Sequence, residues 1–394
     1  MANTRHTLAG PPSLLRAIND RAALELLLAN GPLSRTQLGT LTGLSKPTAS
    51  QLLFRLEAAG LVVPVGTAAG GPGPNAQLYQ VNPAAGYVAG LDVTNTEVRI
   101  AVADITGTTL AEHRVSSRRW AAAETIANVA QAVSETVKLA GLADDALSDV
   151  VIGIGGALDP ATGRLRYAAH RPGWHSPTLL DDLTSAIGAP VMIENDVNLA
   201  AVAEQIHGSA QGCEDFVLLW ADVGVGAAIV IAGQLYRGFT GGAGEVGYMP
   251  LPGAPIVHDV RRKNSGGFQQ LAGAPAVLAL ARKHGLTAPT AAQAVAKAVE
   301  TPGVGDDFLA EFADRLALGM AAIVSVVDPE VLILSGAVPR AGGEPLRALV
   351  QDALAELTMP RPEVRCSTVP GSSVLHGALQ RAAATARDTV FSTH

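Results

Sequence analysis

Cysteine, charged and aromatic side chains are all scarce in this chain of 394 residues. Its two cysteines, Cys213 and Cys366, cannot make a disulfide framework, and no Cys-x-x-Cys pair occurs that could hold zinc. The longest uncharged apolar stretches, around residues 223–236 and 316–327, are shorter than the roughly 18 residues that span a bilayer. Residues 1–10 lack the apolar core of a secretory signal. We therefore expect a soluble, cytoplasmic protein with no membrane contact.

What the sequence does contain is enough apolar material for more than one core. Hydrophobic residues make up 48% of the chain, which excludes wholesale disorder, and the length predicts two or three domains. The charge is unevenly distributed. Residues 1–82 hold six basic and three acidic residues, a net +3, in a chain whose total is −7, which leaves −10 for the rest. This asymmetry indicates a small anion-binding module joined to a larger acidic body.

Residues 1–82 have the pattern of a winged helix-turn-helix domain. Apolar residues at helical spacing predict three helices that end near Ala29, Leu41 and Ala59. Ser34 and Ser45 are natural N-caps for the second and third of these helices. Two short β segments around a Gly/Pro-rich loop follow, and they predict a β-hairpin wing. The alternative interpretation is a helical dimerisation module with a surface hairpin.

In a winged helix-turn-helix domain the third helix lies in the major groove of DNA, with its first residues at phosphates and base edges. Ser45, Thr48 and the helix N-terminus are the predicted phosphate contacts. Lys46, Ser50 and Gln51 are the predicted base contacts. The complete set of candidate DNA-binding residues is Ser34, Arg35, Thr36, Ser45, Lys46, Pro47, Thr48, Ser50, Gln51 and Arg55.

The composition of the wing and the small number of basic residues limit how strongly a single chain could bind DNA. Residues 66–75, at the wing tip, contain no Lys or Arg that could enter a minor groove. Six basic residues in the whole module imply a modest affinity for phosphates. We therefore expect double-stranded operator DNA as the partner, and a homodimer or homotetramer as the form that binds it.

From residue 86 onward, predicted β-hairpins alternate with helices. The predicted strands are 87–92, 97–103, 150–154, 189–193, 216–220, 227–232 and 331–334, and the predicted helices are 124–140, 197–205, 308–326 and 373–389. An order of two strands, a helix and a further strand occurs near Gly90 and again near Phe216. This repetition favours an α/β architecture of two related lobes with a cleft between them.

Four motifs in this region resemble, in order and spacing, those of the ROK family, which groups sugar kinases with transcriptional repressors of sugar genes. They are residues 90–96 (GLDVTNT), 194–198 (ENDVN), 244–248 (GEVGY) and 328–330 (DPE). Residues 31–35 (GPLSR) and 42–48 (TGLSKPT) are similar to the repressor branch, which includes sugar-responsive repressors of xylose and N-acetylglucosamine genes. The resemblance covers nearly the whole chain.

The resemblance implies an α/β chain in which a winged helix-turn-helix precedes a two-lobed, actin-like (ribonuclease H-like) ROK domain. The DNA-binding domain is expected at residues 1–82. The first ROK lobe is expected at 83–197, completed by a C-terminal helix at about 373–389. The second lobe, with the dimerisation surface, is expected at 198–372.

The same resemblance places the catalytic base of the family's kinases at Asp196, with Asn195 and Glu245 beside it as ligands for sugar hydroxyls. A kinase needs such a base at the sugar hydroxyl, together with backbone or cationic groups around the phosphates. The alternative interpretation of this cluster is a carboxylate that is hydrogen-bonded at the end of a strand.

The two loops that hold ATP phosphates in the family's kinases are altered. Thr94 and Asn95 stand where those kinases have two glycines, so their side chains would occupy the space of a phosphate. In the second loop, residues 222–226 (DVGVG), Asp222 would place a carboxylate near a polyphosphate, and Val223 lacks the usual hydroxyl. We therefore expect no ATP binding, no kinase activity and no cofactor, with Asp196 as a vestigial base position.

The zinc site typical of the family is also expected to be absent. The histidine position holds Tyr248, and the three cysteine positions hold residues that are not usual zinc ligands: Val260, Arg262 and Gly267. In relatives with zinc, the histidine and a later glutamate contact the sugar. Tyr248 and Gln269 stand at these positions, and both can still hydrogen-bond a hydroxyl. The candidate sugar-binding residues are therefore Asn195, Asp196, Glu245, Tyr248 and Gln269.

These observations predict a DNA-binding transcriptional regulator of carbohydrate metabolism, with repression as the expected outcome. Its DNA affinity would change when a sugar or sugar derivative binds between the ROK lobes. An ATP-dependent sugar kinase with a DNA-binding head remains an alternative, as does a DNA-binding scaffold whose body only oligomerises. Arg237 and the basic run 261–263 could accept a phosphorylated or acidic effector. The other reading of that run is a solvated surface loop.

Overall fold

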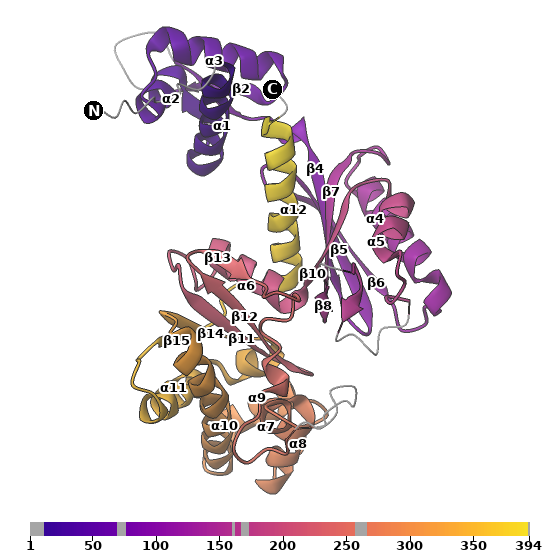
Figure 1. The fold of residues 1–394 in the computed structure, drawn as a ribbon, viewed down its shortest axis with the longest axis vertical. Helices are drawn as coiled ribbons and strands as arrows, with labels where there is room; N and C mark the ends of the chain where they lie inside the picture. Colours follow the sequence, from indigo (N-terminus) through magenta and orange to yellow (C-terminus); the bar gives the residue numbers. More distant parts are fainter. Residues whose placement is uncertain (1–11, 69–75, 160–161, 167–172, 257–265, 393–394) are drawn as a thin grey trace, which may run out of the picture.

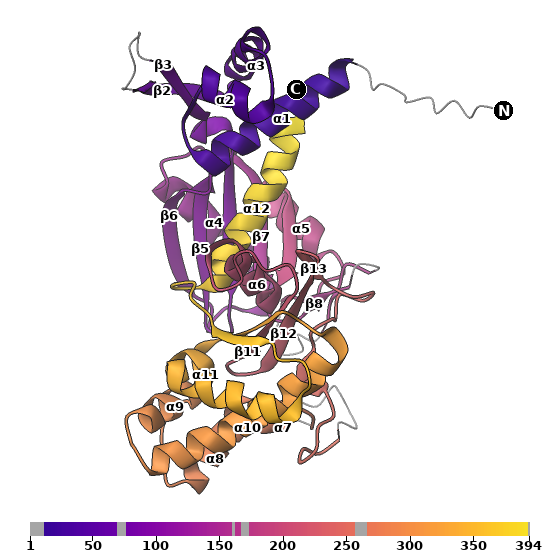
Figure 2. The same ribbon diagram turned by 90° about the vertical axis from the view of Figure 1, so that its left-hand side faces the viewer.

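The computed structural model describes residues 12–68, 76–159, 162–166, 173–256 and 266–392. Three bodies follow one another along the long axis of the molecule: a helical head, a first lobe and a second lobe (Figure 1). A long C-terminal helix runs beside the first lobe and reaches the head (Figures 1 and 2). None of the described helices combines the length and the apolar character that crossing a bilayer requires.

The head is a winged helix-turn-helix, as the sequence predicts. Its elements are α1 (Pro12–Asn30), β1 (Leu33–Ser34), α2 (Arg35–Thr42), α3 (Lys46–Ala58), β2 (Val62–Ala68) and β3 (Ala76–Val81). The strands form an antiparallel sheet in the order β1-β3-β2. Ser34 and Gln37 make a capping box on α2, Gly43 ends that helix in the left-handed conformation, and Ser45 caps α3. Residues 69–75 of the predicted wing tip lie outside the described residues.

The first lobe is a five-stranded sheet with helices on both faces, in the order β10-β7-β4-β5-β6. The strands β4, β5 and β6 are antiparallel, and β7 and β10 run parallel to β4. Its elements are β4 (Tyr87–Val93), β5 (Glu97–Asp104), β6 (Thr109–Ser116), α4 (Thr125–Leu139), β7 (Leu147–Ile154), the small hairpin β8 (Ala157–Leu158) and β9 (Leu165–Arg166), α5 (Leu179–Ile187), β10 (Val191–Asn195), α6 (Asp196–His207) and the last helix, α12 (Ser373–Ser392). Leu91 and Val93 join the core under α4 and α5, whereas Val88 joins the core under α12. Alternate residues of one strand thus fill two cores.

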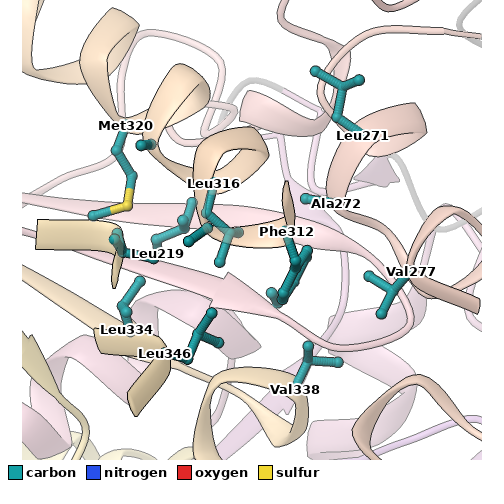
Figure 3. Packing of buried hydrophobic residues seen from close by; sticks show 14 of the residues in the cluster. Leu219, Leu271, Ala272, Val277, Phe312, Leu316, Met320, Leu334, Val338 and Leu346 are labelled. Carbon is teal, nitrogen blue, oxygen red and sulfur yellow. The ribbon is translucent and has the colours of Figure 1, made fainter. Parts of the chain in front are cut away.

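The second lobe repeats this topology, with the strand order β13-β12-β11-β14-β15. Here β11, β12 and β13 are antiparallel, and β14 and β15 continue the sheet in parallel. Described helices cover one face around a core that includes Leu219, Phe312 and Leu346 (Figure 3), and α6 covers the other face. The elements are β11 (Phe216–Ala221), β12 (Val225–Ile231), β13 (Gln234–Tyr236), α7 (Gln269–Ala272), α8 (Ala274–Lys283), α9 (Ala291–Val299), α10 (Val304–Val327), β14 (Val331–Ser335), α11 (Ala337–Leu357) and β15 (Glu363–Cys366). The repeated topology confirms the prediction of two related lobes.

Several elements of both lobes have no counterpart in the sequence prediction. They are the third strand of each antiparallel set, β6 and β13, the final strand β15, the short strands β8 and β9, and the helices α5, α7, α8, α9 and α11. The edge strand β6 exposes every second residue and so lacks an apolar run. The helix α11 contains Pro345 and bends at Gly343, where φ is 52°. Proline and glycine are normally signals for a turn, so this helix is hard to predict from local pattern.

The helix α12 packs closely between the first-lobe sheet and α6, and two glycines permit the contact. A Cβ at Gly377 would lie 1.9 Å from the carbonyl oxygen of Leu199 in α6. A Cβ at Gly90 in β4 would lie 2.8 Å from the backbone nitrogen of Leu379 in α12. Both neighbouring atoms belong to the backbone and cannot rotate away. A side chain at either glycine would therefore push α12 off the sheet or off α6.

The C-terminal end of α12 is part of the head core. Phe391 is only 5% exposed and lies in one buried cluster with Leu24 and Leu27 of α1. Arg21 of α1 forms an ion pair with Asp388 of α12, with 2.5 Å between the charged atoms. Figure 2 shows the helix passing from the level of the first lobe into the head. Packed side chains, and not a free linker, therefore hold the head against the first lobe.

We expect Gly377→Ala to lower the free energy of unfolding by about 1–3 kcal/mol, because the added methyl group overpacks a contact between two helix backbones. Ala384→Ser, at an exposed position of the same helix, should change it by less than about 0.5 kcal/mol. Urea denaturation followed by circular dichroism measures both values. Equal stability of the Gly377→Ala variant and the unmodified protein would contradict the assigned contact.

Candidate functional site

The outward surface of α3 carries many of the predicted DNA-binding residues. The opposite side of the helix, which is formed by Ala49, Leu52, Leu53 and Leu56, is buried in the head. The predicted residues that are exposed are Arg35, Thr36, Ser45, Lys46, Pro47, Thr48 and Gln51. Ser45 Oγ accepts a hydrogen bond from the Thr48 backbone at 3.4 Å and so caps the helix. The exposed helix start, with its partial positive charge, is suited to a phosphate group.

Ser34, Arg35 and Arg55 of the predicted DNA-binding set also have partners within the head. Ser34 is 6% exposed, and its side chain serves the cap of α2. Arg35 donates to the hydroxyl of Tyr79 at 2.6 Å and lies 5.5 Å from the centre of that ring. Arg55 forms an ion pair with Asp20 at 2.6 Å. The cap at Ser34 is as predicted. Arg35 joins α2 to the wing and Arg55 joins α3 to α1, and the sequence prediction assigns neither of these two structural roles.

A cavity of about 930 Å³ lies between the two lobes. The carboxyl ends of β4, β10 and β11 line it, together with the first residues of α6, α11 and α12. Asn195, Asp196 and Glu245 of the predicted sugar-binding set line the cavity. Tyr248 and Gln269 are not among the described residues that line it. The fold thus brings together only part of the predicted set.

Asn195 and Asp196 stand where β10 passes directly into α6. Asn195 Oδ1 accepts a hydrogen bond from the Asn198 backbone at 3.1 Å and caps the helix. Its Nδ2 donates to the carbonyl oxygen of Gly156 at 2.9 Å. Asp196 Oδ1 accepts from the Val197 backbone at 2.9 Å. The junction therefore holds an amide and a carboxylate in fixed orientations at the wall of the cavity.

Glu245 is the second acidic residue at this end of the cavity. Its burial, and then the charge of nearby Asp196, raise the pKa of the Glu245 carboxyl to about 7. Near neutral pH a substantial fraction of the Glu245 carboxyl is protonated and can donate a hydrogen bond, while an ionised carboxylate can only accept one. A group that can donate or accept in this way is suited to the hydroxyls of a sugar.

Arg237, which the sequence offers as a contact for an acidic effector, is held by a buried carboxylate. Its Nε and Nη2 both donate to Glu194 Oε2, at 2.7 and 2.6 Å. The other oxygen of Glu194 accepts from the Asn195 backbone at 3.0 Å and from Asn198 Nδ2 at 2.9 Å. Arg237 therefore helps to fix the start of α6. The basic run 261–263 lies outside the described residues.

The side chain of Gln269, a predicted sugar contact, is hydrogen-bonded to backbone groups at the cavity wall. The Gln269 amide oxygen accepts from the Val225 backbone at 2.9 Å, and its nitrogen donates to the carbonyl oxygen of Val223 at 3.2 Å. The side chain is thus fastened to the second of the two altered loops, and does not line the cavity. Tyr248 ends a short 3-10 turn, η3 (Val246–Tyr248), beside Gly267.

In the first altered loop, the side chain of Thr94 makes hydrogen bonds to the backbone of the same loop. Thr94 Oγ1 accepts from the backbone nitrogens of Thr96 and Glu97, at 3.3 and 3.1 Å, and donates to the Glu97 carbonyl at 3.0 Å. In a glycine-rich loop such backbone N–H groups would be open to a phosphate. Asn95, exposed at the tip of this turn, also lines the cavity.

The second altered loop is closed in a similar way. The Val225 backbone nitrogen donates to the Gln269 amide oxygen, and the Asp222 backbone nitrogen donates to the Gly224 carbonyl at 3.0 Å. Burial raises the pKa of the Asp222 carboxyl. Above that pKa the carboxylate adds a negative charge at the cavity wall, where a phosphate would be repelled.

Sequence reasoning missed two residues that fix the start of α12 at the cavity. Ser372 Oγ donates to Asp92 Oδ2 of the first lobe at 2.7 Å and accepts from the Leu375 backbone at 3.1 Å. Arg340 of α11, in the second lobe, donates to the carbonyl oxygen of Gly371 at 3.2 Å. Serine before an apolar helical pattern is a known start signal and could have indicated Ser372. No local signal points to Arg340.

Among the residues that the structure describes, no group of three or more His, Cys, Asp or Glu side chains is arranged to hold a metal ion. Two positions of the predicted lost zinc site, Val260 and Arg262, lie outside the described residues.

Comparison with known proteins yields two family matches. The model described as the ROK family matches residues 88–388, and the model described as winged helix-turn-helix DNA-binding matches residues 16–63. Among curated proteins, the chain is 26% identical to the xylose repressor of Caldicellulosiruptor bescii, over 82% of this chain and 84% of that one. It is 29% identical to the glucokinase of Thermotoga maritima, over 52% of this chain and 69% of that one.

Among solved structures, the fold is similar to those of a transcriptional regulator and of a kinase. A ROK family transcriptional regulator, described as a homologue of the E. coli MLC protein, has a TM-score of 0.74 at 18% identity, covering 96% of this chain and 100% of that one. The ROK hexokinase from Thermus thermophilus has a TM-score of 0.64 at 26% identity, covering 77% of this chain and 99% of that one. Because the match to the transcriptional regulator covers 96% of this chain, it includes the head as well as the two lobes.

We expect Glu245→Gln to stabilise the protein more at pH 8 than at pH 5. The folded pKa of about 7 lies above the ordinary value of 4.5, so the unfolded chain ionises first and native stability falls as the pH rises from about 4.5 to 7. Glutamine carries no charge and avoids this loss. Thermal melts at the two pH values measure the difference, and Asp145→Asn, an exposed acid, is the control. A pH-independent shift would contradict the assignment.

Proposed function

The chain belongs to the ROK family, and we propose that it is a transcriptional regulator whose affinity for operator DNA responds to a sugar. The head binds DNA through α3, and a sugar or sugar derivative bound between the lobes alters that binding. Repression is the expected outcome. The match of the head to winged helix-turn-helix DNA-binding domains and the names of relatives, xylose repressors among them, support this proposal.

The observation that carries the proposal is the course of α12. Its first residues line the cavity between the lobes, and its last residues lie in the core of the head. Ser372 ties the start of the helix to the first lobe, and Arg340 ties the preceding residue to the second lobe. A ligand that draws the lobes together therefore acts on the element that supports the head.

Closure of the lobes would act on DNA binding through the geometry of a dimer. The head is packed against the first lobe through Phe391 and the pair of Arg21 with Asp388, so these parts move together while the second lobe rotates. In a homodimer joined through the second lobes, this rotation changes the spacing of the two α3 helices. Operator half-sites are spaced by turns of the DNA helix, so a small change in that spacing weakens binding.

The effector is proposed to be a sugar because of the groups at the cavity wall. Asp196 and Glu245 together offer hydrogen-bond donors and acceptors to hydroxyls. Arg237, which the sequence offered as a contact for an acidic effector, is already paired with Glu194. A neutral sugar is therefore favoured over a phosphorylated one at this end of the cavity.

A sugar kinase is the second candidate function, and the retained Asp196 and the glucokinase relatives favour it. We propose that the chain is not a kinase. In the two altered loops, backbone nitrogens of Thr96, Glu97 and Val225 are already bonded to side chains. Phosphoryl transfer depends on free backbone or cationic groups around the phosphates.

We expect no ATP-dependent phosphorylation of glucose, xylose or N-acetylglucosamine, and no thermal stabilisation by ATP with magnesium. A bound ligand at 100 times its dissociation constant would add about 2.7 kcal/mol to the free energy of unfolding. A coupled assay for ADP release and a thermal melt with ATP measure the two properties, with a glucokinase as positive control. Turnover above the no-sugar background would establish the kinase alternative.

We expect one neutral monosaccharide or disaccharide to raise the melting temperature and to weaken binding to the operator about tenfold or more. The screen compares neutral sugars with their 6-phosphates, and fluorescence anisotropy measures DNA binding at one fixed salt concentration. Asp196→Ala should abolish the response and leave DNA binding unchanged, whereas Asp145→Ala, in the exposed turn that precedes β7, should change neither. DNA binding that no sugar alters would favour the scaffold alternative.

A further inference from the structure

The recognition helix exposes a line of residues that the predicted DNA contacts only partly include. With 3.6 residues per turn, positions i, i+4, i+7 and i+11 follow one face of a helix. On α3 the face opposite the buried leucines carries Pro47, Gln51, Phe54 and Ala58, and all four are exposed. Gln51 is the polar member of the line. Phe54, one turn further on, was not among the predicted contacts.

Phe54 is unusual because its large apolar side chain is 72% exposed. Its neighbours in the helix, Leu52, Leu53 and Leu56, are buried in the head core. Burying an aromatic side chain away from water is favourable, and Phe54 gains little of this in the isolated protein. An exposed ring of this kind on a recognition surface indicates a contact that forms with a partner.

DNA is the partner that the surroundings of Phe54 favour. The same face begins at the capped, positively polarised start of α3, with Lys46 exposed beside it. The head carries a net charge of +3 over residues 1–82, which suits a phosphate backbone. Figures 1 and 2 show α3 at the end of the molecule, away from the second lobe, where a duplex can approach it.

We propose that Phe54 is a specificity residue that contacts the 5-methyl group of a thymine in the operator. The major groove presents this methyl group as its apolar feature, and phenylalanine is one of the side chains that contact it. The proposal rests on the proposed DNA-binding function of the head. It adds a base preference that the predicted polar contacts do not contain.

The spacing of Phe54 and Gln51 extends the proposal to the next base pair. The two residues are three positions apart, which is about 4.5 Å along the helix axis at 1.5 Å per residue. Base pairs are stacked about 3.4 Å apart, so the two side chains meet the same or adjacent base pairs. The amide of glutamine pairs with adenine through its N6 and N7 atoms. Each half-site should therefore contain neighbouring A·T pairs under this part of α3.

The test begins with duplexes selected from a random library by the full-length protein. Each thymine of the selected half-site is then replaced by deoxyuridine, which removes the methyl group and leaves the base pairing intact. We expect one replacement per half-site to weaken binding about fourfold, equivalent to about 0.8 kcal/mol for one buried methyl group. Anisotropy at constant salt concentration measures the affinities.

Three variants test whether the weaker binding of the deoxyuridine duplex depends on the Phe54 side chain. Phe54→Ala should bind the thymine duplex about as weakly as the unmodified protein binds the deoxyuridine duplex, and should not distinguish the two. Phe54→Leu retains an apolar contact and should recover part of the discrimination. Phe239→Ala is the matched control, because Phe239 is 98% exposed but lies in the second lobe, and it should behave as the unmodified protein.

The outcomes separate this proposal from the proposed function. If no duplex is selected at any salt concentration, the DNA-binding function fails. If duplexes are selected but no deoxyuridine replacement changes the affinity, DNA binding stands and the role of Phe54 is rejected. The role is also rejected if Phe54→Ala, with an unchanged melting temperature, still distinguishes thymine from deoxyuridine.

Discussion

The helix α12 can lie where it does because Gly377 lets its backbone touch the backbone of α6 at Leu199. A second glycine, Gly90, lets the same helix sit on the first-lobe sheet. This close packing brings one end of the helix to the cavity and the other to the head, where Phe391 enters the core. The head, the first lobe and the wall of the cavity thus depend on one continuous element. A change in lobe closure therefore has a direct physical path to the recognition helix.

The two ends of the cavity differ in the hydrogen bonds that they can offer to a ligand. At one end, Asp196 and Glu245 retain polar groups that can still meet a hydroxyl. At the other, backbone N–H groups that could donate to a phosphate donate instead to Thr94 Oγ1 and, from the cavity-lining Val225, to the amide oxygen of Gln269. A loop whose backbone nitrogens are already satisfied gains little from a phosphate and would have to break those bonds to bind one. This difference supports the proposal of a regulator that binds a sugar without phosphorylating it.

Much of the fold was accessible from local pattern. The serine caps of α2 and α3 and the repeated order of strands and helices depend on residues within a few positions of one another, so a single sequence reveals them. The edge strand β6 and the bent helix α11 were missed because their local sequences do not carry the usual pattern. The strand β6 lacks an apolar run, and the helix α11 contains Pro345 and a kink at Gly343. Packing against the sheets stabilises both elements despite their unfavourable local sequence.

The sequence by itself determined which chemical groups are available: the capped recognition helix, the acidic and amide residues after β10, and loops without their glycines. Only the tertiary structure decided how these groups are used. Arg35 and Arg55 are bonded within the head, and Gln269 is bonded to a loop, although the sequence offered all three as ligand contacts. Their partners lie 35 to 46 residues away along the chain. Helical periodicity and capping extend over a few residues, so such pairings become visible only when the chain has folded.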